Sequence, residues 1–329
     1  MAILVTGGLG YVGSHAVKML MDSGREVVSF DNLLFGHEEA SSGSAIVIGD
    51  LLDIEALRGA FDKYPIDAVM HFAALADVGD SVVYPHRYYA TNVTGSLNLL
   101  QVMLEHNVKN LIFSSTAAVF GEPREIPIPE DHPKDPTNPY GRSKLMFEEI
   151  LAESEAAYGI RWVALRYFNA SGADPSGLIG EDHTPEHHLI PIVLQVALGQ
   201  REKVILFGDD WDTPDGSGIR DYVHVTDLAQ AHMLALQHLE KGGASAVYNM
   251  GNGNGQSVKE VIQVSREITG AVIPAVAGPR RPGDPARLVA SSDKIKRELG
   301  WNPQFADLRT IVQMAWDWHK GHPNGYGSG

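Results

Sequence analysis

The sequence predicts an α/β protein in which a doubly wound parallel sheet is joined to a smaller α/β lobe. Segments of strand and helix character alternate through the first half of the 329-residue chain. Such alternation with short connections is typical of a parallel sheet covered by helices on both faces. Beyond about residue 169 the alternation breaks, and proline, glycine and aspartate become frequent. This change favours loops that form the walls of a ligand site on a second lobe.

The alternating segments can be assigned in chain order. Short apolar runs predict strands, and longer stretches with apolar residues at helical spacing predict helices. The expected strands are 2–5, 26–30, 45–48, 68–72, 110–113 and 162–166. A first helix is expected near Ser14, and three further helices over about 53–62, 85–106 and 140–158.

Small or polar residues follow five of these strands directly. They are Gly7–Gly13, Asp31, Asp50, Ala73–Ala74 and Ser114–Thr116, in the order of the strands. Open parallel sheets bind their ligands outside the carboxyl ends of the strands. We therefore expect these residues to line a ligand site.

The turn after the first strand has the spacing of a dinucleotide-binding loop. Glycines stand at positions 7, 10 and 13, and Val17, Leu20 and Met21 then repeat at helical spacing. In a strand–turn–helix context, such glycines let the backbone approach a pyrophosphate, which the N–H groups at the helix N-terminus bind. The fold is therefore expected to be of the Rossmann type. The alternative is a glycine turn that merely closes a βα unit.

The acidic residue that ends the second strand indicates which dinucleotide binds. Asp31 lies 18 residues beyond Gly13, close to where a carboxylate accepts hydrogen bonds from the adenosine ribose. A carboxylate at this place repels the 2′-phosphate of NADP. We expect the cofactor to be NAD.

The segment 138–144 places a tyrosine and a lysine on one face of a helix. Asn138 can cap the helix and Pro139 suits its first position, so that Tyr140 and Lys144 stand at i and i+4. A free phenol has a pKa of about 10, and a nearby ammonium group and a helix N-terminus both favour the phenolate. The pair predicts a general acid–base catalyst, although the same spacing also occurs on ordinary surface helices.

Composition and charge argue against several classes of protein. The net charge is −15, from 26 basic and 41 acidic residues, which disfavours a nucleic-acid or anionic-membrane partner. The chain contains no cysteine, so disulfide and thiolate chemistry are excluded. The first apolar run is too short for a signal peptide, and no apolar stretch of 18 residues is present that could span a membrane. We expect a cytoplasmic protein.

Two further motifs are interpreted as structural. Gly251–Gly255 resembles a second phosphate loop, but Ser257 and Glu260 form the pattern of a capping box that opens a helix. The histidines at positions 183, 187 and 188 suggest a metal site, yet they lack the carboxylate pattern of a catalytic zinc helix. We expect a turn at the first motif and a loop without a metal at the second.

Together the motifs resemble those of the extended short-chain dehydrogenases/reductases and, within them, the UDP-glucose 4-epimerases. The glycine loop and the tyrosine–lysine pair are shared by many relatives, whereas 218–225 and 280–284 are more specific to nucleotide-sugar enzymes. The resemblance covers essentially the whole chain. The motifs that carry it are 6–15, 31–32, 49–51, 140–144, 166–169, 219–225, 280–284, 300–303 and 323–326.

The resemblance implies interconversion of UDP-galactose and UDP-glucose through a transient 4-keto sugar, with tightly bound NAD. Tyr140 would remove the proton from the sugar 4-hydroxyl, and Thr116 would hydrogen-bond the 4-oxygen. Lys144 would lower the Tyr140 pKa and bind the nicotinamide ribose. The cofactor-binding residues that the resemblance implies are Gly7, Gly10, Tyr11, Val12, Gly13, Asp31, Asn32, Asp50, Leu51, Phe72, Ala73, Ala74, Asn92, Ser114, Tyr140, Lys144 and Tyr167.

The resemblance also implies where the UDP-sugar binds. Arg220 and Arg281 are expected at its diphosphate, because guanidinium groups suit phosphate oxygens, and Phe207 matches a position of the uracil pocket. The full set of implied substrate-binding residues is Thr116, Tyr140, Asn169, His188, Leu189, Phe207, Arg220, Arg281, Asp284 and Leu288. The expected division is an NAD-binding domain of residues 1–168 and 221–248, and a nucleotide-sugar-binding domain of 169–220 and 249–329. Helices 85–106 and 140–158 resemble the pair that forms the dimer interface of relatives, so we expect a homodimer.

Three positions depart from the commonest pattern of these enzymes. Ala76 stands where many have a lysine near the cofactor diphosphate, so we expect either weaker binding of NAD or binding through backbone donors instead. His188 replaces an asparagine. Leu288 replaces a tyrosine or smaller residue that guards the 2-substituent of the sugar, so we expect a side activity on the N-acetylated pair, UDP-N-acetylglucosamine and UDP-N-acetylgalactosamine, as an open possibility.

Three functions other than epimerisation are compatible with a nucleotide-binding fold of this kind, and each makes its own demand on the sequence. A nucleotide-sugar 4,6-dehydratase needs an acid and a base after the threonine, and here Ala117 and Ala118 follow Thr116. A dehydrogenase that releases NADH is not excluded by the sequence. A catalytically silent NAD-binding scaffold should have lost Tyr140 or Lys144, and both are present.

Overall fold

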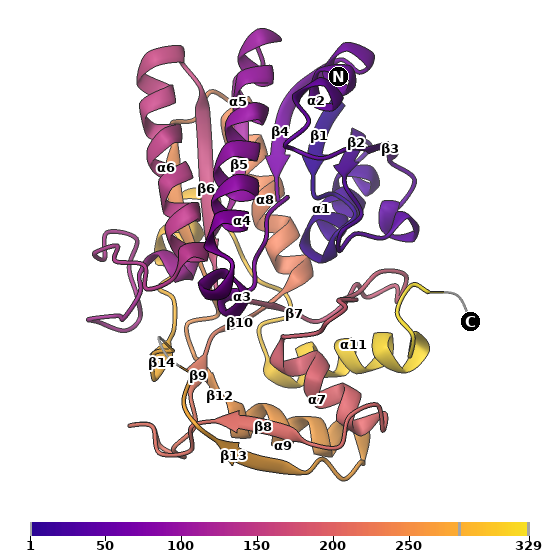
Figure 1. Cartoon of the computed structure of the whole chain (residues 1–329), viewed down its shortest axis with the longest axis vertical. Helices are drawn as coiled ribbons and strands as arrows, with labels where there is room; N and C mark the ends of the chain where they lie inside the picture. The colour runs from indigo at the N-terminus through magenta and orange to yellow at the C-terminus, as the bar shows by residue number, and fades with distance from the viewer. Residues whose placement is uncertain (1, 282–283, 328–329) are drawn as a thin grey trace.

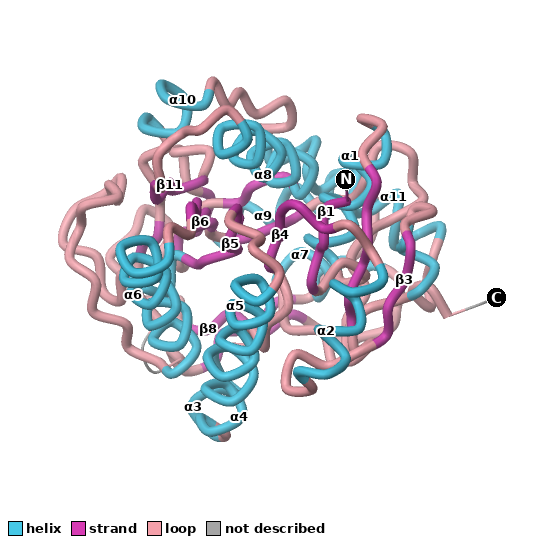
Figure 2. The backbone as a smooth tube through the Cα atoms, turned by 90° about the horizontal axis from the view of Figure 1, so that it is seen from above, coloured by secondary structure: helices cyan, strands magenta, loops and turns pink. Residues whose placement is uncertain are grey.

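A parallel sheet of seven strands forms the centre of the first lobe (Figures 1 and 2). The computed structural model describes residues 2–281 and 284–327. The strand order is β11-β6-β5-β4-β1-β2-β3, and all neighbouring pairs run parallel. The strands are β1 (Ala2–Thr6), β2 (Glu26–Asp31), β3 (Ala45–Ile48), β4 (Ile66–His71), β5 (Asn110–Thr116), β6 (Arg161–Tyr167) and β11 (Ala246–Met250). The doubly wound parallel sheet is confirmed.

Helices cover both faces of this sheet, because successive side chains of a strand point to opposite faces. On one face Ile3 and Val5 pack with apolar residues of α1 (Tyr11–Asp22) and α8 (Val225–Glu240). On the other face Leu4 packs with residues of α2 (Ile54–Lys63), α5 (Ser96–Glu105) and α6 (Pro139–Tyr158). Figure 2 shows the sheet between these two layers of helices.

The helix expected over 85–106 is divided into three parts. α4 (Pro85–Tyr89) is followed by the π-helix η2 (Ala90–Gly95), and α5 continues from Ser96. In η2, Asn92 bonds to Leu75 and Ser143. A π turn shifts the register of a helix and often lies at a functional site. The expected helical stretch is therefore present from Pro85 to Glu105, with a π-helical segment at its centre.

A smaller lobe, in the lower half of Figure 1, is formed by segments of the chain that follow β6. Helices α7 (Leu189–Ala197), α9 (Val258–Thr269) and α11 (Leu308–Gly321) pack together through apolar residues, and β8 (Val204–Phe207) pairs parallel with β13 (Ala275–Gly278). Short strands join this lobe to the sheet. They are β7 (Asn169–Ser171) with β10 (Tyr222–His224), and β9 (Ile219–Arg220) with β12 (Gln256–Ser257) and β14 (Arg287–Leu288).

One segment of the C-terminal half packs against the first lobe. Ile295 of α10 (Asp293–Leu299) and Trp301 belong to the core formed with α1 and α8. The Trp301 indole donates to the Asp227 carbonyl, and the Asp227 carboxylate accepts the Gln304 N–H at 2.7 Å. The 300–303 motif therefore docks at the start of α8 and connects the C-terminal part of the chain to the first lobe.

The turn at 251–255 is structural, as the sequence predicts. Ser257 and Glu260 form the expected capping box at the start of α9. The buried Asp221 carboxylate accepts the N–H groups of Asn252 and Gly253 at 2.7 and 3.0 Å. Among the described residues, no helix is long and apolar enough to cross a bilayer.

Candidate active site

The glycine turn after β1 has the backbone of a phosphate-binding loop. Gly7 has φ +67°, and a Cβ there would lie 2.6 Å from the Ala73 nitrogen. A Cβ on Gly13 would lie 2.0 Å from the Gly7 carbonyl oxygen, so helix and turn could not approach as they do. No side chain caps the N-terminus of α1, which leaves its N–H groups for an anion. The loop therefore fits a dinucleotide pyrophosphate.

Asp31 joins the glycine turn to the end of β2. Its Oδ2 accepts the Leu9 N–H at 3.0 Å and its Oδ1 accepts the Leu33 N–H at 2.9 Å. Burial raises the pKa of this carboxyl, and the two backbone hydrogen bonds lower it in part. A carboxylate has about four lone-pair positions, so Asp31 retains acceptor capacity for a ribose.

The other residues expected at the cofactor lie along the same edge of the sheet. Asn32 donates to Asp50 Oδ2 at 2.8 Å, beyond β2 and β3. Phe72 and Ala73 both donate their N–H groups to the Thr6 carbonyl, so the end of β4 lies beside the glycine turn. The remaining members are the partly buried Val12 and Ala74 and the buried Tyr11 and Leu51.

Asn92 is buried, and its amide group is occupied by protein partners. Its Oδ1 accepts the Leu75 N–H at 2.9 Å, and its Nδ2 donates to the Leu75 carbonyl and to Ser143 Oγ, each at 3.0 Å. Both amide hydrogens therefore bond to protein atoms, one in the segment that follows β4 and one in α6. A direct contact of this side chain with the cofactor stays a prediction.

The helix that carries the tyrosine and the lysine begins as expected. Asn138 Oδ1 accepts the Gly141 N–H at 2.9 Å, and Pro139 is the first residue of α6. The helix then runs over 20 residues to Tyr158. Tyr140 and Lys144 therefore lie in its first two turns, at the carboxyl end of β5.

The Tyr140 phenol does not have the expected acidity. Burial raises its pKa, and a hydrogen bond with Thr116 lowers it only in part. Lys144 is not a cause of this shift; its Nζ donates to the Ser114 carbonyl at 3.0 Å and lies 4.9 Å from the centre of the Phe113 ring. The expected direction is corrected, because desolvation raises the pKa by more than the hydrogen bond with Thr116 lowers it. Thr116 is a hydrogen-bond partner of the phenol, and its predicted contact with the sugar 4-oxygen stays a prediction.

The pKa of Lys144 is lowered to near neutral pH. Burial lowers its pKa to about 7, and the carboxylate of Glu148, one helical turn further on, raises it in part. Glu148 is itself buried and accepts from Arg166 Nε at 2.9 Å and from Ser115 Oγ at 2.5 Å. A buried lysine with such a pKa can hold or release a proton near neutral pH.

A second tyrosine stands near the first. Tyr167, the last residue of β6, shares a short hydrogen bond with Ser114 Oγ. Burial raises the Tyr167 pKa, and the proximity of Tyr140 raises it further. Ser114 and Thr116 belong to β5 rather than following it, so the strand is longer than expected and presents both hydroxyls from one rigid element.

The smaller lobe brings the expected substrate residues together in pairs. The Arg220 guanidinium lies 3.7 Å from Asp284 Oδ2, and the Arg281 guanidinium lies 3.8 Å from the centre of the Phe207 ring. Leu288 pairs with Arg220 across β14 and β9. Two cations and an exposed aromatic ring thus lie on neighbouring strands and loops, an arrangement suited to a phosphate-bearing ligand with an aromatic base.

The remaining expected substrate residues border the two lobes. Leu288 packs against the apolar cluster that contains Ala117, next to Thr116. Asn169 Nδ2 donates to the Asp221 carbonyl at 3.1 Å. His188, which precedes the first residue of α7, Leu189, lies 2.9 Å from Glu186 through Nδ1.

Sequence reasoning missed the ion pair beneath Lys144. Arg166 and Glu148 are both almost completely buried, and Arg166 donates from Nε to Glu148 Oε1 and from Nη2 to Glu148 Oε2. The available signal is Arg166 itself, a charged residue that follows the apolar run 162–165 in a strand. A charged residue inside an apolar strand is rarely buried unless it is paired.

The arrangement supports acid–base chemistry on a ligand shared between the lobes. A phenol, a threonine hydroxyl and a lysine near neutrality converge at the carboxyl end of β5. The loop for a dinucleotide lies two strands away at β1, beyond β4, where the strand order reverses. This is where doubly wound sheets bind their ligands.

Comparison with known proteins supplies independent evidence. Residues 3–251 match the NAD dependent epimerase/dehydratase family. The chain is 57% identical over 326 residues to a UDP-glucose 4-epimerase of Halalkalibacterium halodurans, a match that covers 99% of this chain and 98% of the relative. It is 51% identical over 329 residues to that of Streptococcus mutans, with 99% of each chain covered.

Solved structures of similar proteins have the same fold. UDP-glucose 4-epimerase from Brucella ovis in complex with NAD superposes with a TM-score of 0.93 at 45% identity, over 96% of this chain and 97% of the other. The Bifidobacterium longum enzyme in complex with NAD⁺ and UDP gives a TM-score of 0.95 at 41% identity, over 99% and 100% of the two chains.

Proposed function

Because the chain belongs to the NAD dependent epimerase/dehydratase family and, within it, to the UDP-glucose 4-epimerases, we propose that it interconverts UDP-galactose and UDP-glucose. The observation that carries the proposal is the contact between Tyr140 and Thr116 at the carboxyl end of β5, on a lobe with a dinucleotide loop. NAD is the cofactor, and when bound it supplies reversible hydride acceptance, so that the reaction proceeds through a transient 4-keto sugar without net redox change.

The proton steps belong to Tyr140 and its neighbours. Tyr140 takes the proton of the sugar 4-hydroxyl and returns it to the 4-oxygen after the sugar has turned its other face towards the cofactor. Thr116 hydrogen-bonds the same oxygen and shares the proton. Because burial raises the pKa of the free phenol, the phenolate needs a cation nearby. Lys144 can supply that charge in its protonated form, and the cationic ring of oxidised NAD adds to it.

Residues of the two lobes hold cofactor and substrate. The N–H groups of the glycine loop and α1 hold the pyrophosphate, Asp31 accepts from the adenosine ribose, and Lys144 binds the nicotinamide ribose. Arg220 and Arg281 hold the diphosphate of the sugar nucleotide, with Phe207 against the uracil. The pairs Arg220–Asp284 and Arg281–Phe207 support this assignment, since they place both guanidinium groups on one side of the smaller lobe.

The remaining features of the proposal concern the molecule as a whole. We propose an NAD-binding domain of residues 1–168 and 221–248 and a nucleotide-sugar-binding domain of 169–220 and 249–329. We also propose that the enzyme is a cytoplasmic homodimer of galactose metabolism. Exposed apolar side chains on α5 and α6, Leu97 and Met146, support the dimer.

A side activity on N-acetylated UDP-sugars is the second candidate function. Leu288 lies beside the cluster next to Thr116, where its branched side chain occupies less space than a tyrosine. UDP-N-acetylglucosamine 4-epimerase from Methanobrevibacter ruminantium has the same fold, with a TM-score of 0.86 at 28% identity. The size of the side chain at position 288, beside the sugar 2-substituent, then determines how much of this activity the chain has.

The decisive experiment is a coupled assay on purified protein. UDP-galactose is supplied without added reductant, and UDP-glucose and free NADH are both measured. We expect UDP-glucose to form while free NADH does not accumulate. Stoichiometric release of NADH would instead identify a dehydrogenase, and loss of water from the sugar a dehydratase. Retained NAD without turnover of UDP-galactose would reject the proposed substrate while leaving the cofactor assignment intact.

A further inference from the structure

A cluster of two histidines and two glutamates lies on the loop between β7 and α7. Glu181, His183, Glu186 and His188 each offer one ligand atom, and all four atoms lie within 4.8 Å of one another. Among the described residues, these form the single group of this kind. The sequence predicts no metal here, because these histidines lack the carboxylate pattern of a catalytic zinc helix. In the folded chain, Glu181 and Glu186 nevertheless lie beside His183 and His188.

The distances within the cluster are those of a small coordination sphere. His188 Nδ1 lies 2.8 Å from Glu181 Oε1 and 2.9 Å from Glu186 Oε1, and His183 Nδ1 lies 3.3 Å from Glu181 Oε1. Nitrogen and oxygen ligands at about 2.0–2.2 Å from a tetrahedral zinc ion stand roughly 3.3 Å apart. Small side-chain adjustments would therefore place all four atoms around one ion.

Two of these atoms have no hydrogen-bond partner. Glu181 is 3% exposed, and its Oε1 lies close to both histidines without the geometry of a hydrogen bond. His183 Nδ1 is likewise buried and unpartnered. Leaving buried polar atoms unpaired is costly. A metal ion bound within the cluster would give both atoms a partner.

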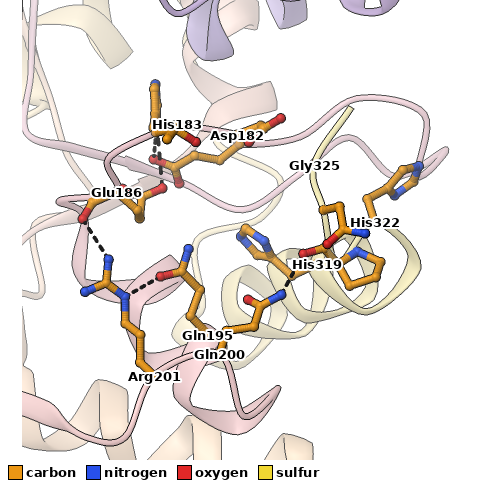
Figure 3. A pocket seen from close by; sticks show the side chains of 13 residues that line it. Asp182, His183, Glu186, Gln195, Gln200, Arg201, His319, His322 and Gly325 are labelled. Atoms are coloured by element: carbon orange, nitrogen blue, oxygen red, sulfur yellow. Dashed lines mark hydrogen bonds and ion pairs between the residues drawn. The ribbon is translucent and has the colours of Figure 1, made fainter. Parts of the chain in front are cut away.

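Neighbouring residues hold the loop in place around this centre. The His183 ring meets the edges of the Tyr11 and Phe35 rings, with centroids 6.3 and 6.4 Å apart. Arg201 donates to the Glu186 carbonyl. Figure 3 shows His183 and Glu186 at one end of a cavity of about 650 Å³, which His319 of α11 also lines. The cluster is thus partly buried but reachable by a small ion.

We propose that Glu181, His183, Glu186 and His188 form a binding site for a divalent transition metal, of which zinc fits best. Zinc accepts mixed imidazole and carboxylate ligands in tetrahedral geometry, and its structural sites are closed by four protein ligands. The proposed role of the ion is structural, although His188 is also one of the substrate-binding residues that the family resemblance implies. A bound ion would fix the loop at 181–188 against Tyr11 at the start of α1, and would hold the residue that precedes α7.

The competing explanation is a cluster of ion pairs without a metal. Burial lowers the pKa of His183, but Glu181 and Glu186 raise it to about 9, so protonated histidines could satisfy the carboxylates alone. The two explanations differ in one measurable respect, because only the metal site retains zinc after excess ion is removed.

The test is zinc binding by the tag-free holoenzyme. The protein is treated with EDTA, equilibrated with zinc chloride, freed of excess ion by gel filtration and analysed by mass spectrometry for zinc. We expect one zinc ion per chain, a rise in Tm on adding zinc and its reversal by EDTA. Since the chain has no cysteine, thiolate sites cannot contribute. His183→Gln and Glu186→Gln should each lose the bound ion.

The matched control is His187→Gln. His187 stands between the ligands in sequence, but it pairs with Asp77 at 3.1 Å outside the cluster. This variant should keep its zinc. Absence of zinc from the parent protein would overturn the proposal in favour of ion pairs. Equal zinc in the parent and in both ligand variants would overturn it as well, because the ion would then be bound elsewhere. Neither result depends on epimerase activity.

Discussion

At the scale of single residues, burial controls the acid–base properties of the site. Tyr140 and Lys144 stand on one helix, yet desolvation raises the pKa of the phenol and lowers that of the ammonium group to about 7. Each shift disfavours the charged form, because a charge loses hydration when it is buried. Burial therefore favours the uncharged forms of both groups, and we expect the positive charge of oxidised NAD, when bound, to favour the Tyr140 phenolate.

Removal of the Tyr140 hydroxyl tests its role directly. We expect Tyr140→Phe to lower kcat by about 10² to 10⁴, the range for loss of a general acid–base group. Folding and NAD content should stay unchanged, since only one hydroxyl is lost. Tyr158→Phe is the control, because Tyr158 ends the same helix and is exposed. Near-parental turnover in Tyr140→Phe would show that another group moves the proton.

Leu288 tests the gate for the sugar 2-substituent. We expect Leu288→Tyr to reduce turnover of UDP-N-acetylgalactosamine relative to UDP-galactose by about tenfold or more, since steric selection of this kind is worth about 1–3 kcal/mol. Leu288→Met, which conserves volume, is the control. The measurement is kcat/KM for both sugars. An unchanged ratio in the tyrosine variant would argue against a gate at this position.

At the scale of elements, the contact between β1 and α1 forms the cofactor loop. The helix can start so close to the strand only because Gly13 has no side chain facing the Gly7 carbonyl. The same element carries Tyr11, whose hydroxyl donates to the Gly172 carbonyl at 2.7 Å and so connects the loop to the second lobe. The position of the loop therefore depends on both lobes.

A matched pair of glycine substitutions tests this contact. We expect Gly13→Ala to lower the free energy of unfolding by about 1–3 kcal/mol, as overpacking does, and to reduce the NAD retained on purification. Gly59→Ala lies within α2 with no atom near its new Cβ. It should raise stability by about 0.5–1 kcal/mol through helix propensity. Urea unfolding and NAD content measure both effects. Equal stability of the two variants would contradict the close approach.

At the scale of the whole molecule, buried neutral histidines make the fold sensitive to acid. Burial lowers the pKa of His15 and His232 to about 4 and that of His71 and His224 to about 3. The unfolded chain binds protons at these groups below pH 6.5, and the folded chain does not until near pH 4. Stability is therefore complete above pH 6.5 and falls as the pH decreases toward 4.

His232→Phe tests this pH dependence. The His232 ring lies 4.5 Å from that of Phe72, so a phenyl ring can take its place. We expect the parent to lose about 2 kcal/mol more than the variant between pH 7 and pH 5, from a pKa of about 4 against 6.5. Urea unfolding at both pH values measures the difference. Parallel losses in the two proteins would show that His232 is protonated in the native state.

The outer face of α5 and α6 is the expected dimer surface. Leu97 and Met146 are 42% and 38% exposed there, and both views show the two helices side by side (Figures 1 and 2). Light scattering should give about twice the chain mass of 35.7 kDa. Leu97→Glu combined with Met146→Glu should shift this toward one chain, because buried unpaired charges are costly at an interface. Leu178→Glu, on a loop outside α5 and α6, is the control, and a monomeric parent would contradict the dimer.

Local patterns in the chain were sufficient for the sheet, the glycine loop, the start of α6 at Asn138 and the capping box at Ser257. Each depends on residues adjacent in sequence or on hydrophobic spacing within one element, so no knowledge of distant contacts is required. The family motifs, which span nearly the whole chain, added the cofactor and the reaction.

Other features required the folded chain, because they depend on burial and on groups distant in sequence. The rise in the Tyr140 pKa follows from desolvation, which helix position alone does not predict. Arg166 pairs with Glu148 only because β6 packs beside α6, and Arg220 pairs with Asp284 only through the fold of the smaller lobe. The four residues at 181–188 are near in sequence, yet their side chains converge because the loop bends against Tyr11. The distance between two such groups, and the degree to which each is buried, depend on how the whole chain packs. Neighbouring residues in the sequence therefore do not predict them.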